Sequence, residues 1–482
     1  MSHVKINKTL LDEKFTELEK AKKWSPRVVS KLETLLNSPD DEALFCINPI
    51  RFASEKNIKE DEAIDLFLYG AHLQLFTMNW ALICPSCTGL VESFASLKGL
   101  HSEYCCNMCN LEYEVNMDDM IQINFTVDPE LREIIFHHPA KLSAEDYLFK
   151  YRLRPEGQID LGNGNMIPLR DAMKTARLFL GILAPSEKKV LDLDCKPGVL
   201  SGYNLRHDFG FTFLVTSPAI TGSQNLKIVC SNGEAKPKSG TLSAGQVHLE
   251  IENITKDEHS LFIFNQEEAD MKMAIQFVPF LTGKRLITHQ TFRDLFRFET
   301  VSGTEGIGVK NITFLFTDLK GSTAMYDRIG DLKAYTLVQQ HFDRLTKVIV
   351  AHSGSIVKTI GDAVMATFMT PSQATQAAVE MLSEIEHFNK TLKSQEIILK
   401  IGIHQGASIA VTLNDRLDYF GQTVNIAARV QSLADAEEIY MTEIVYDNID
   451  PHLLKGFHIS RVRSSLKGVQ EDVNVHKVWK KK

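Results

Sequence analysis

Apolar residues at helical spacing dominate the first 80 positions of the chain. Between residues 6 and 36 they recur every three or four positions, for example at Leu11 and Leu18, which predicts two amphipathic helices. Residues 50–57 and 59–77 continue the pattern as a short and a longer helix. This outline is typical of a helix-turn-helix. Because acidic residues dominate the start of the second helix, we expect it to pack or dock rather than bind DNA.

From about residue 121 the pattern changes to short β-like runs separated by Gly, Pro, Asn and Asp. The turn residues and the spacing favour an antiparallel sandwich or barrel, with one helix at residues 169–181. The expected strands are residues 120–127, 210–217, 226–230, 245–253, 260–266 and 274–279.

Helical spacing returns at residues 286–300, and a Gly-rich joint at residues 302–308 follows. Residues 311–482 then mix both periodicities, which predicts an α+β fold. The expected strands are residues 312–316, 356–360, 363–368, 399–406 and 408–413. The expected helices are residues 322–352, with a break at Gly330-Asp331, 371–393 and 423–434. Tight turns are expected at Gly361-Asp362 and at residues 414–416.

The composition describes a globular chain. With 482 residues, 44% of them hydrophobic, it is long enough for about three domains with full cores. The formal net charge of −8 provides no basic excess, which argues against nucleic acid as a partner. No run approaches the roughly 18 apolar residues of a membrane span, and the first residues lack the apolar core of a secretory signal. We therefore expect a cytoplasmic protein without a membrane span.

Five of the eight cysteines lie between Cys84 and Cys109. Two C-x2-C pairs stand 18 residues apart, a spacing typical of a zinc ribbon in which four thiolates hold one structural ion. The predicted ligands are Cys84, Cys87, Cys106 and Cys109. The alternative is four reduced cysteines without a metal. Cys105 has the wrong offset for a ligand, and Cys46, Cys195 and Cys230 are isolated.

Two aspartates stand at turns of the C-terminal segment. The strand at residues 312–316 ends at Asp318, and Ser322 or Thr323 is the expected N-cap of the next helix. Backbone amides from Lys320 through Gly321 to Thr323 could hold phosphate oxygens there, while Asp318 offers an oxygen ligand to a divalent cation. Asp362, in the hairpin turn, is a second carboxylate, and two such groups suit a pair of metal ions. Taken alone, each aspartate is more often a helix cap or a turn residue.

The predicted helix at residues 423–434 carries Asn425 and Arg429. These residues are four apart and therefore share one helix face. A neutral donor beside a permanent cation can bind a phosphoryl group on which negative charge develops. The alternative is an exposed face on which Arg429 pairs with a carboxylate.

With these motifs and Leu417-Asp-Tyr-Phe-Gly421, residues 311–479 resemble the class III nucleotide cyclase catalytic domain. The resemblance implies a ferredoxin-like fold with additions. It implies that Asp318 and Asp362, helped by the Leu319 carbonyl, bind two Mg or Mn ions, and that Asn425 and Arg429 act on the nucleotide during transfer. It also implies that Lys467 contacts the terminal phosphates, beside the phosphate site already expected at Gly321, Ser322 and Thr323 from the amides at the helix start.

In this family the positions of Lys358 and Asp418 contact the adenine edge. An ammonium donates to adenine N1, and a carboxylate accepts from the exocyclic amine. Guanylate-forming members usually carry Glu and Cys or Ser there. The family's sites lie between two catalytic domains, so the resemblance implies a homodimer with two complete sites.

We therefore predict an adenylate cyclase that uses ATP. The alternatives are a guanylate cyclase, a non-catalytic nucleotide-sensing scaffold, and a DNA-binding role for the helix-turn-helix and zinc ribbon. An unknown regulatory ligand or protein would act on the N-terminal half. We expect five segments: a helical region (1–83), the zinc ribbon (84–120), a β-rich regulatory domain (121–285), a helical linker (286–310) and the catalytic domain (311–482).

Overall fold

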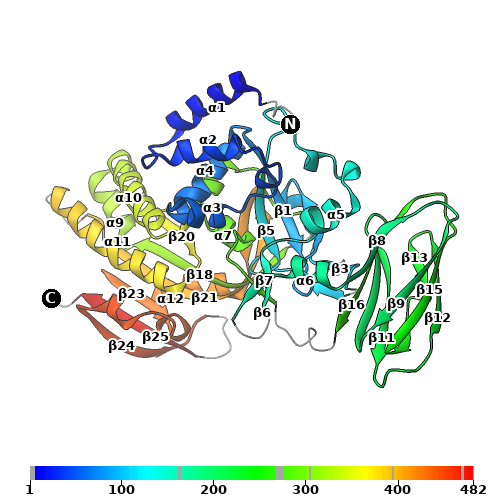
Figure 1. Cartoon of the computed structure of the whole chain (residues 1–482). Helices are drawn as coiled ribbons and strands as arrows, with labels where there is room; N and C mark the ends of the chain where they lie inside the picture. The colour runs from blue at the N-terminus through cyan, green and yellow to red at the C-terminus, as the bar shows by residue number, and fades with distance from the viewer. Residues whose placement is uncertain are drawn as a thin grey trace.

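The computed structural model describes residues 6–109, 111–160, 164–267, 275–302, 306–392, 396–467 and 472–480. Over these residues the predicted α+β class is confirmed. Helices come first, several sheets follow, and a mixed sheet with its helices ends the chain (Figure 1). None of the helices in these ranges is both long enough and apolar enough to cross a membrane.

The N-terminal helices follow the predicted pattern. They are α1 (Lys8–Ala21), α2 (Val28–Leu36), α3 (Pro49–Lys56) and α4 (Glu60–His72). The prediction that the fourth helix continues to residue 77 is wrong, because strand β1 (Phe76–Ile83) starts there. Phe76, Met78 and Trp80 of β1 are buried while Thr77 is exposed, which is the two-residue period of a strand.

Strand β1 is the centre of an antiparallel sheet with the order β2-β1-β5, in which β2 is Leu90–Phe94 and β5 is Ile121–Val127. A separate hairpin, β3 (Glu103–Cys106) and β4 (Leu111–Glu114), carries the second cysteine pair. This sheet joins strands from three of the five expected segments. The division of the chain into five segments therefore remains a prediction. Short helical turns lie at Glu42–Leu44, Leu97–Gly99, Ile135–His137, Pro139–Lys141, Ala144–Asp146, Tyr147–Arg152 and Pro451–Leu454.

The β-rich middle is a two-sheet sandwich, as expected, and it projects from the rest of the molecule on the side away from the C-terminus (Figure 1). Its sheets have the orders β14-β11-β10-β16-β8 and β13-β12-β15-β9. The strands are β8 (Arg177–Leu183), β9 (Lys188–Cys195), β10 (Gly198–Asn204), β11 (Phe209–Thr216), β12 (Gln224–Ser231), β13 (Glu234–Lys236), β14 (Ser239–Ser243), β15 (Gly245–Asn253) and β16 (His259–Glu267).

Three details of this region differ from the predictions. The sandwich is not fully antiparallel, because β11 pairs with β14 and β12 with β15 in parallel. The helix expected at residues 169–181 ends early, as α6 (Leu169–Thr175), because the next residues pair with β16 as strand β8. The strand expected at residues 274–279 is β17 (Ile275–Phe277), which pairs with β6 (Gly157–Asp160) beside β7 (Met166–Pro168); residue 274 lies outside the described residues.

The C-terminal sheet has the order β19-β20-β18-β21-β23-β25-β24, with β22 paired to β21. Its strands are β18 (Ile307–Leu319), β19 (Ser355–Ile360), β20 (Ala363–Phe368), β21 (Leu399–Leu413), β22 (Arg416–Phe420), β23 (Glu438–Thr442), β24 (Phe457–Ser464) and β25 (Val473–Lys480). The helices are α9 (Ser322–Ile329), α10 (Asp331–Ala351), α11 (Pro371–Leu392), α12 (Gln422–Leu433) and α13 (Glu443–Tyr446). The order from β18 to β21 is the βαββαβ order of a ferredoxin-like fold.

The break at Gly330 and the hairpin of β19 and β20 agree with the sequence patterns. The two strands expected at residues 399–406 and 408–413 are one continuous strand, β21. It is long because β18 pairs along nearly all of it, from Leu319↔Leu399 to Ile307↔Ala410. Residue 393, the expected end of the third helix, lies outside the described residues.

Strand β18 separates two hydrophobic cores. Leu315 faces the core formed with α10 and α11. Phe314 and Phe316 face the other core, which also contains Trp80 of β1 and Phe292 of the linker. The N-terminal half and one face of the C-terminal sheet therefore share a single core.

The linker is not one helix over residues 286–300 but two short helices, α7 (Gly283–Ile287) and α8 (Gln290–Leu295). Residues 303–305 of the predicted joint lie outside the described residues. Phe292 of α8 is buried and meets Trp80 edge to face, with ring centroids 5.9 Å apart. Burying a phenyl ring in this way contributes about 2 kcal/mol.

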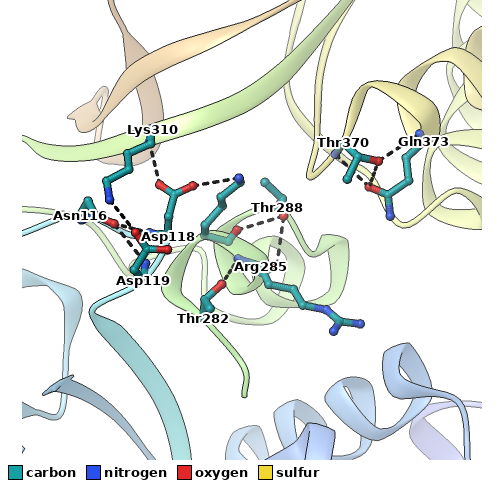
Figure 2. Close-up of polar contacts among 10 residues, drawn as sticks. Asn116, Asp118, Asp119, Thr282, Arg285, Thr288, Lys310, Thr370 and Gln373 are labelled. Carbon is teal, nitrogen blue, oxygen red and sulfur yellow. Dashed lines mark hydrogen bonds and ion pairs between the residues drawn. The ribbon is translucent and has the colours of Figure 1, made fainter. Parts of the chain in front are cut away.

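An ionic network holds the start of β18 against the N-terminal half (Figure 2). The Asp118 carboxylate accepts from the Lys310 amide at 2.7 Å and pairs with the Lys284 ammonium at 2.9 Å. The Lys310 ammonium lies 2.5 Å from Asp119. The Met117 amide donates to the Gly308 carbonyl at 2.9 Å. The side chains of Asp118 and Lys284 are each only 10% exposed, so removing either would leave an uncompensated charge at the joint.

Candidate active site

Asp318 and Asp362 lie at the same end of two paired strands. The antiparallel register between β18 and β20, with Phe316 opposite Met365, brings Asp318 level with the start of β20. The Thr317 hydroxyl accepts from the Val364 amide at 3.1 Å and fixes this end of the pair. The two carboxylates predicted to bind metal therefore come from neighbouring backbone positions.

The surroundings of the two carboxylates differ. Lys400, directly opposite Asp318 in the β18–β21 register, places its ammonium 2.6 Å from the Asp318 carboxylate. One carboxylate oxygen of Asp362 is buried and has no hydrogen-bond partner among the described residues. A buried carboxylate oxygen without a donor is costly unless a cation or a donor completes it. This oxygen, beside a second carboxylate, fits the oxygen donors that a divalent cation prefers.

An imidazole adjoins the Asp362 carboxylate on its helix side. His341 of α10 is fully buried, and burial lowers its pKa to about 4, an effect that Asp362 only partly opposes. The imidazole is therefore neutral at pH 7 and adds no positive charge that would compete with a cation.

The loop after Asp318 opens helix α9. The N-cap is Gly321 rather than the predicted Ser322 or Thr323, and no side chain caps this end. Gly321 has φ 71°, a left-handed conformation that glycine adopts without strain. The Lys320 amide is already bonded to the Ile398 carbonyl at 2.8 Å. The amides open to a phosphate therefore begin at Gly321, one residue later than predicted.

The structure brings Lys358 and Asp418 together, although they lie on strands β19 and β22. The Lys358 ammonium is 2.5 Å from the Asp418 carboxylate, whose second oxygen accepts from the Tyr419 amide at 2.8 Å. Asp418 lies on the β21–β22 hairpin, which we call the arm. The Tyr419 ring packs edge to face on Phe314 of β18, with centroids 5.3 Å apart.

Helix α12 presents Asn425 exposed and Arg429 half-buried. It lies very close to the sheet, since a side chain at Gly402 of β21 would come within 2.2 Å of the Gln431 amide. Across the ranges that the structure describes, no carboxylate lies within ion-pair distance of Arg429. The alternative in which Arg429 merely pairs with a carboxylate of its own chain therefore finds no support there.

The structure says less about the surroundings of the remaining predicted residues, Leu319 and Lys467. The Leu319 side chain is buried in the core beneath α10, which fixes the backbone that carries its carbonyl. Lys467 is exposed, and its neighbour Gly468 lies outside the described residues. In the described part of the chain no hydrogen bond or ion pair joins Asp318 or Asp362 to Lys358, Asp418, Asn425 or Arg429. The metal group (Asp318, Asp362) and the base group (Lys358, Asp418) are therefore not in direct polar contact within the described residues of one chain.

The four predicted zinc ligands form one compact cluster. Their sulfur atoms all lie within 4.8 Å of one another, with Cys87–Cys106 at 3.7 Å and Cys84–Cys109 at 3.9 Å. A tetrahedral zinc with bonds of about 2.3 Å requires sulfurs about 3.8 Å apart. The neighbouring Cys106 and Cys109 thiols hold the pKa of Cys84 below its ordinary value, and the Tyr113 hydroxyl lies 2.9 Å from the same sulfur. Cys105 is exposed and outside the cluster, as predicted.

Two features of the site were not predicted. Lys400 stood within an expected strand, but its contact with Asp318 depends on the β18–β21 register, which one sequence does not specify. The linker residues Gln290 and Arg293 contact the strands of Lys358 and Asp418, at 2.8 Å to the Ile356 amide and 3.0 Å to the Leu417 carbonyl. They were predicted only as part of a helix.

Two family models match the chain. The model described as the adenylate and guanylate cyclase catalytic domain matches residues 307–478. The model described as a family of unknown function, DUF5939, matches residues 11–294. The first covers the C-terminal sheet with every predicted residue of the active site, and the second covers the N-terminal half up to α8.

Curated relatives and a solved structure each match about a quarter to two fifths of this chain. Adenylate cyclase 1 of Rhizobium meliloti is 27% identical over 138 residues, which are 26% of this chain and 21% of that protein. The adenylate cyclase of Anabaena cylindrica is 28% identical over 186 residues, 35% of this chain and 37% of that protein. The chain thus spans well under half the length of either relative. The crystal structure of the adenylyl cyclase CyaB from P. aeruginosa is 23% identical and covers 37% of this chain and 97% of its own, with a TM-score of 0.32.

Proposed function

The chain belongs to the DUF5939 family and ends in a class III adenylate/guanylate cyclase domain, and on that premise we propose that it is an adenylate cyclase. In the proposed reaction the ribose 3′-hydroxyl of ATP attacks the α-phosphorus and releases pyrophosphate, which leaves 3′,5′-cyclic AMP. A class III cyclase acts on a nucleotide. The specific part of our proposal is that the base of this nucleotide is adenine and not guanine.

The observation that carries the choice of adenine is the contact between Lys358 and Asp418, at 2.5 Å. An ammonium beside a carboxylate matches adenine, whose N1 accepts and whose exocyclic amine donates. Guanine presents the opposite arrangement at these positions, a donor at N1 and an acceptor at O6. Asp418 is only 9% exposed in its side chain, so a base bound there would meet a carboxylate that is already partly desolvated. A guanylate cyclase is the competing possibility within the same domain family.

The cation site would be formed by Asp318 and Asp362 with the Leu319 carbonyl. The buried, unpaired oxygen of Asp362 supports this assignment. Two Mg or Mn ions bound there would activate the attacking hydroxyl and stabilise the leaving pyrophosphate. Lys400 contacts one oxygen of Asp318, so the other carboxylate oxygen would be the one offered to a cation.

The chain's own groups would orient the phosphates. Amides from Gly321 to Thr323 point out of the N-terminus of α9 and suit phosphate oxygens. Asn425 and Arg429 are one helical turn apart on α12 and would donate to the phosphoryl group as negative charge develops on it. Lys467 would add a cation near the terminal phosphates. Positioning and charge stabilisation are what phosphoryl transfer requires of a protein.

We propose a homodimer in which the metal group of one chain meets the base group of the other. The described residues of a single chain link them by no hydrogen bond or ion pair, and Arg429 lacks a carboxylate partner there. The arm that carries Asp418 also exposes Phe420 by 65% and its cross-strand partner Ile409 by 41%. A second copy could bury these apolar side chains while bringing its aspartates to the base group.

The four-cysteine cluster would hold a structural zinc, since four sulfurs leave no position for a substrate. The N-terminal half would be regulatory and respond to a ligand or protein that the sequence does not specify. Its contacts with β18 and β22 support a regulatory role.

The decisive experiment uses the full-length purified chain with ATP or GTP and with Mg or Mn, followed by analysis for cyclic products. We expect cyclic AMP from ATP and little cyclic GMP from GTP. Cyclic GMP as the main product would show a guanylate cyclase. No cyclic product with either nucleotide and either metal would favour a non-catalytic nucleotide-sensing scaffold.

A further inference from the structure

Helix α8 of the linker contacts both strands that carry the two residues proposed to bind the base, Lys358 and Asp418. Lys358 lies on β19 and Asp418 on β22, and their ion pair shows that the two strands meet. Gln290 and Arg293 of α8 are three residues apart, so their side chains leave the same face of the helix. Each makes a hydrogen bond to the backbone of one of these strands.

Arg293 holds the strand of Asp418. Its guanidinium donates to the Leu417 carbonyl at 3.0 Å, which belongs to the peptide bond joining Leu417 to Asp418. The same group lies over the Tyr419 ring, 5.4 Å from its centroid, and donates to the Ile287 carbonyl at 2.9 Å. Arg293 has no carboxylate partner among the residues the structure describes. Its charge is therefore directed to the backbone and the ring that flank Asp418.

Gln290 holds the strand of Lys358. Its side-chain oxygen accepts from the Ile356 amide at 2.8 Å. Strand β19 is the edge of the sheet, and its register shifts between Ile356 and Lys358. An edge strand with such an irregularity has few backbone bonds of its own to fix it. The contact from Gln290 therefore constrains the backbone two residues from Lys358.

Helix α8 is itself fixed to the N-terminal helices. His289 and Thr291 both contact the Asp65 carboxylate of α4, at 2.8 and 2.5 Å. Phe292 is buried in the shared core. Since the residues on either side of Gln290 are anchored to α4, a movement of α4 would change the positions of Gln290 and Arg293.

We propose that Gln290 and Arg293 are positioning residues for base recognition, through which the DUF5939 region sets how tightly and how selectively the cyclase domain binds its nucleotide. This inference rests on the proposed function of Lys358 and Asp418. It links the N-terminal half to the residues proposed to bind the base, Lys358 and Asp418, and not to the proposed metal ligands.

The test compares kinetics with ATP and GTP for the full-length protein and its variants. Arg293→Ala should raise the KM for ATP about tenfold and reduce the preference for ATP over GTP by a similar factor, because a hydrogen bond from a charged donor is lost. Arg293→Lys should recover part of the loss, since an ammonium can still reach a carbonyl. Gln290→Met keeps the length of the side chain but removes the acceptor, so a severalfold change in the same direction is expected. Amide exchange at Ile356 should become faster in this variant.

Two controls stay close to the tested residues. Arg297→Ala removes an exposed arginine of the same linker, whose bond within the described ranges is to the Asp294 carbonyl. Asp294→Ala removes the other partner of Gln290, at 3.0 Å, and leaves the contact with Ile356. Both should keep the wild-type KM and base preference.

The outcomes separate this inference from the proposed function. Folded Arg293→Ala and Gln290→Met proteins with wild-type KM and base preference, or with equal losses of kcat for both nucleotides, would overturn the positioning role. A wild-type enzyme that prefers GTP would overturn the adenylate assignment. A change in the ATP-to-GTP preference of the variants would still support the positioning role. If no product forms, the same ratio is measured by titrating ATP and GTP binding. A wild-type protein that binds neither would overturn both proposals.

Discussion

The four cysteines of the N-terminal half and the two aspartates of the C-terminal sheet differ in how far the protein encloses them. The cysteine sulfurs face one another within 4.8 Å, and three of the four residues are buried. Asp318 is half-buried and held by Lys400, while Asp362 keeps a buried oxygen without a partner. One cluster is closed on all sides by its own ligands, and the other is open to further ligands.

The difference separates two uses of a metal. A cation among four thiolates has a full coordination shell, so it stabilises the fold and has little reason to leave. Two carboxylates supply only part of a shell, so a cation there needs water or a substrate to complete it. Closure therefore indicates a structural ion, and an incomplete donor set indicates one that takes part in a reaction.

The largest expected effect is the loss of turnover when the open site is broken. Asp318→Ala or Asp362→Ala should reduce cyclic nucleotide formation about a thousandfold or more, because each carboxylate would hold a catalytic cation. The fold should persist, with a modest fall of the unfolding midpoint in Asp318→Ala, which leaves the Lys400 ammonium without its partner, and little change in Asp362→Ala. Initial rates and thermal unfolding of the full-length variants test both statements.

A matched control is Asp327→Ala on α9, where the aspartate is exposed. It should retain wild-type turnover. If Asp318→Ala kept normal product formation, the open site would not be catalytic and the comparison of the two sites would fail.

Mixing two inactive variants tests whether the open site is shared between chains. Asp318→Ala and Arg429→Ala should each be nearly inactive, but their heterodimer has one intact site. Random exchange gives half heterodimers with one good site of two, so about a quarter of wild-type activity should return. Co-expression with two affinity tags ensures that heterodimers exist. Confirmed heterodimers without activity would contradict the shared site.

The closed site should respond in its metal content and stability. The purified protein should contain about one zinc per chain, and Cys106→Ser should lose it and lower the unfolding midpoint, because one of four thiolates is missing. The neighbouring Cys105→Ser is the control, since Cys105 is exposed and outside the cluster. Elemental analysis and thermal unfolding measure the effect. A wild-type protein without zinc, never exposed to chelator, would remove the assignment.

The smallest expected effect is a change of stability with pH, because the sheet that carries the open site contains a half-buried imidazole, His404. Burial lowers the pKa of His404 to about 4, from 6.5. Its neutral form is favoured in the folded state, so its contribution to stability is complete above pH 6.5 and is lost as the pH falls towards 4. The loss is about 1.4 kcal/mol per pH unit, or about 2 kcal/mol at pH 5.

His404→Gln should remove this part of the pH dependence while keeping a partner for the Thr442 hydroxyl, which lies 2.9 Å from the ring. Denaturant unfolding between pH 5 and 7 measures it. His248→Gln, on the exposed face of the sandwich, is the control and should follow wild type. An unchanged slope in His404→Gln would contradict the assignment.

Local sequence signals predicted the fold where each element depends on its own residues. The break at Gly330, the hairpin at Gly361-Asp362 and the amphipathic N-terminal helices followed from turn chemistry and periodicity. Errors arose where distant pairing decides the element. Residues 177–183 form strand β8 because they pair with β16, although the sequence before them is helical.

The candidate site was likewise predicted only in part, where its residues belong to sequence motifs. Motif positions identified Lys358 and Asp418, and the structure places them in contact although 60 residues separate them. Lys400, Gln290 and Arg293 could not be found in that way. Their partners are backbone groups or register neighbours on other elements, and a single sequence carries no record of such pairing.

The shared core limits how this chain could have been assembled or could be divided. Trp80, Phe292, Phe314 and Tyr419 belong to one hydrophobic cluster although they come from both family regions. A cyclase domain excised at residue 307 would present that face of its sheet to water. An excised cyclase domain would therefore lose the side chains of the DUF5939 region that now bury this face of its sheet.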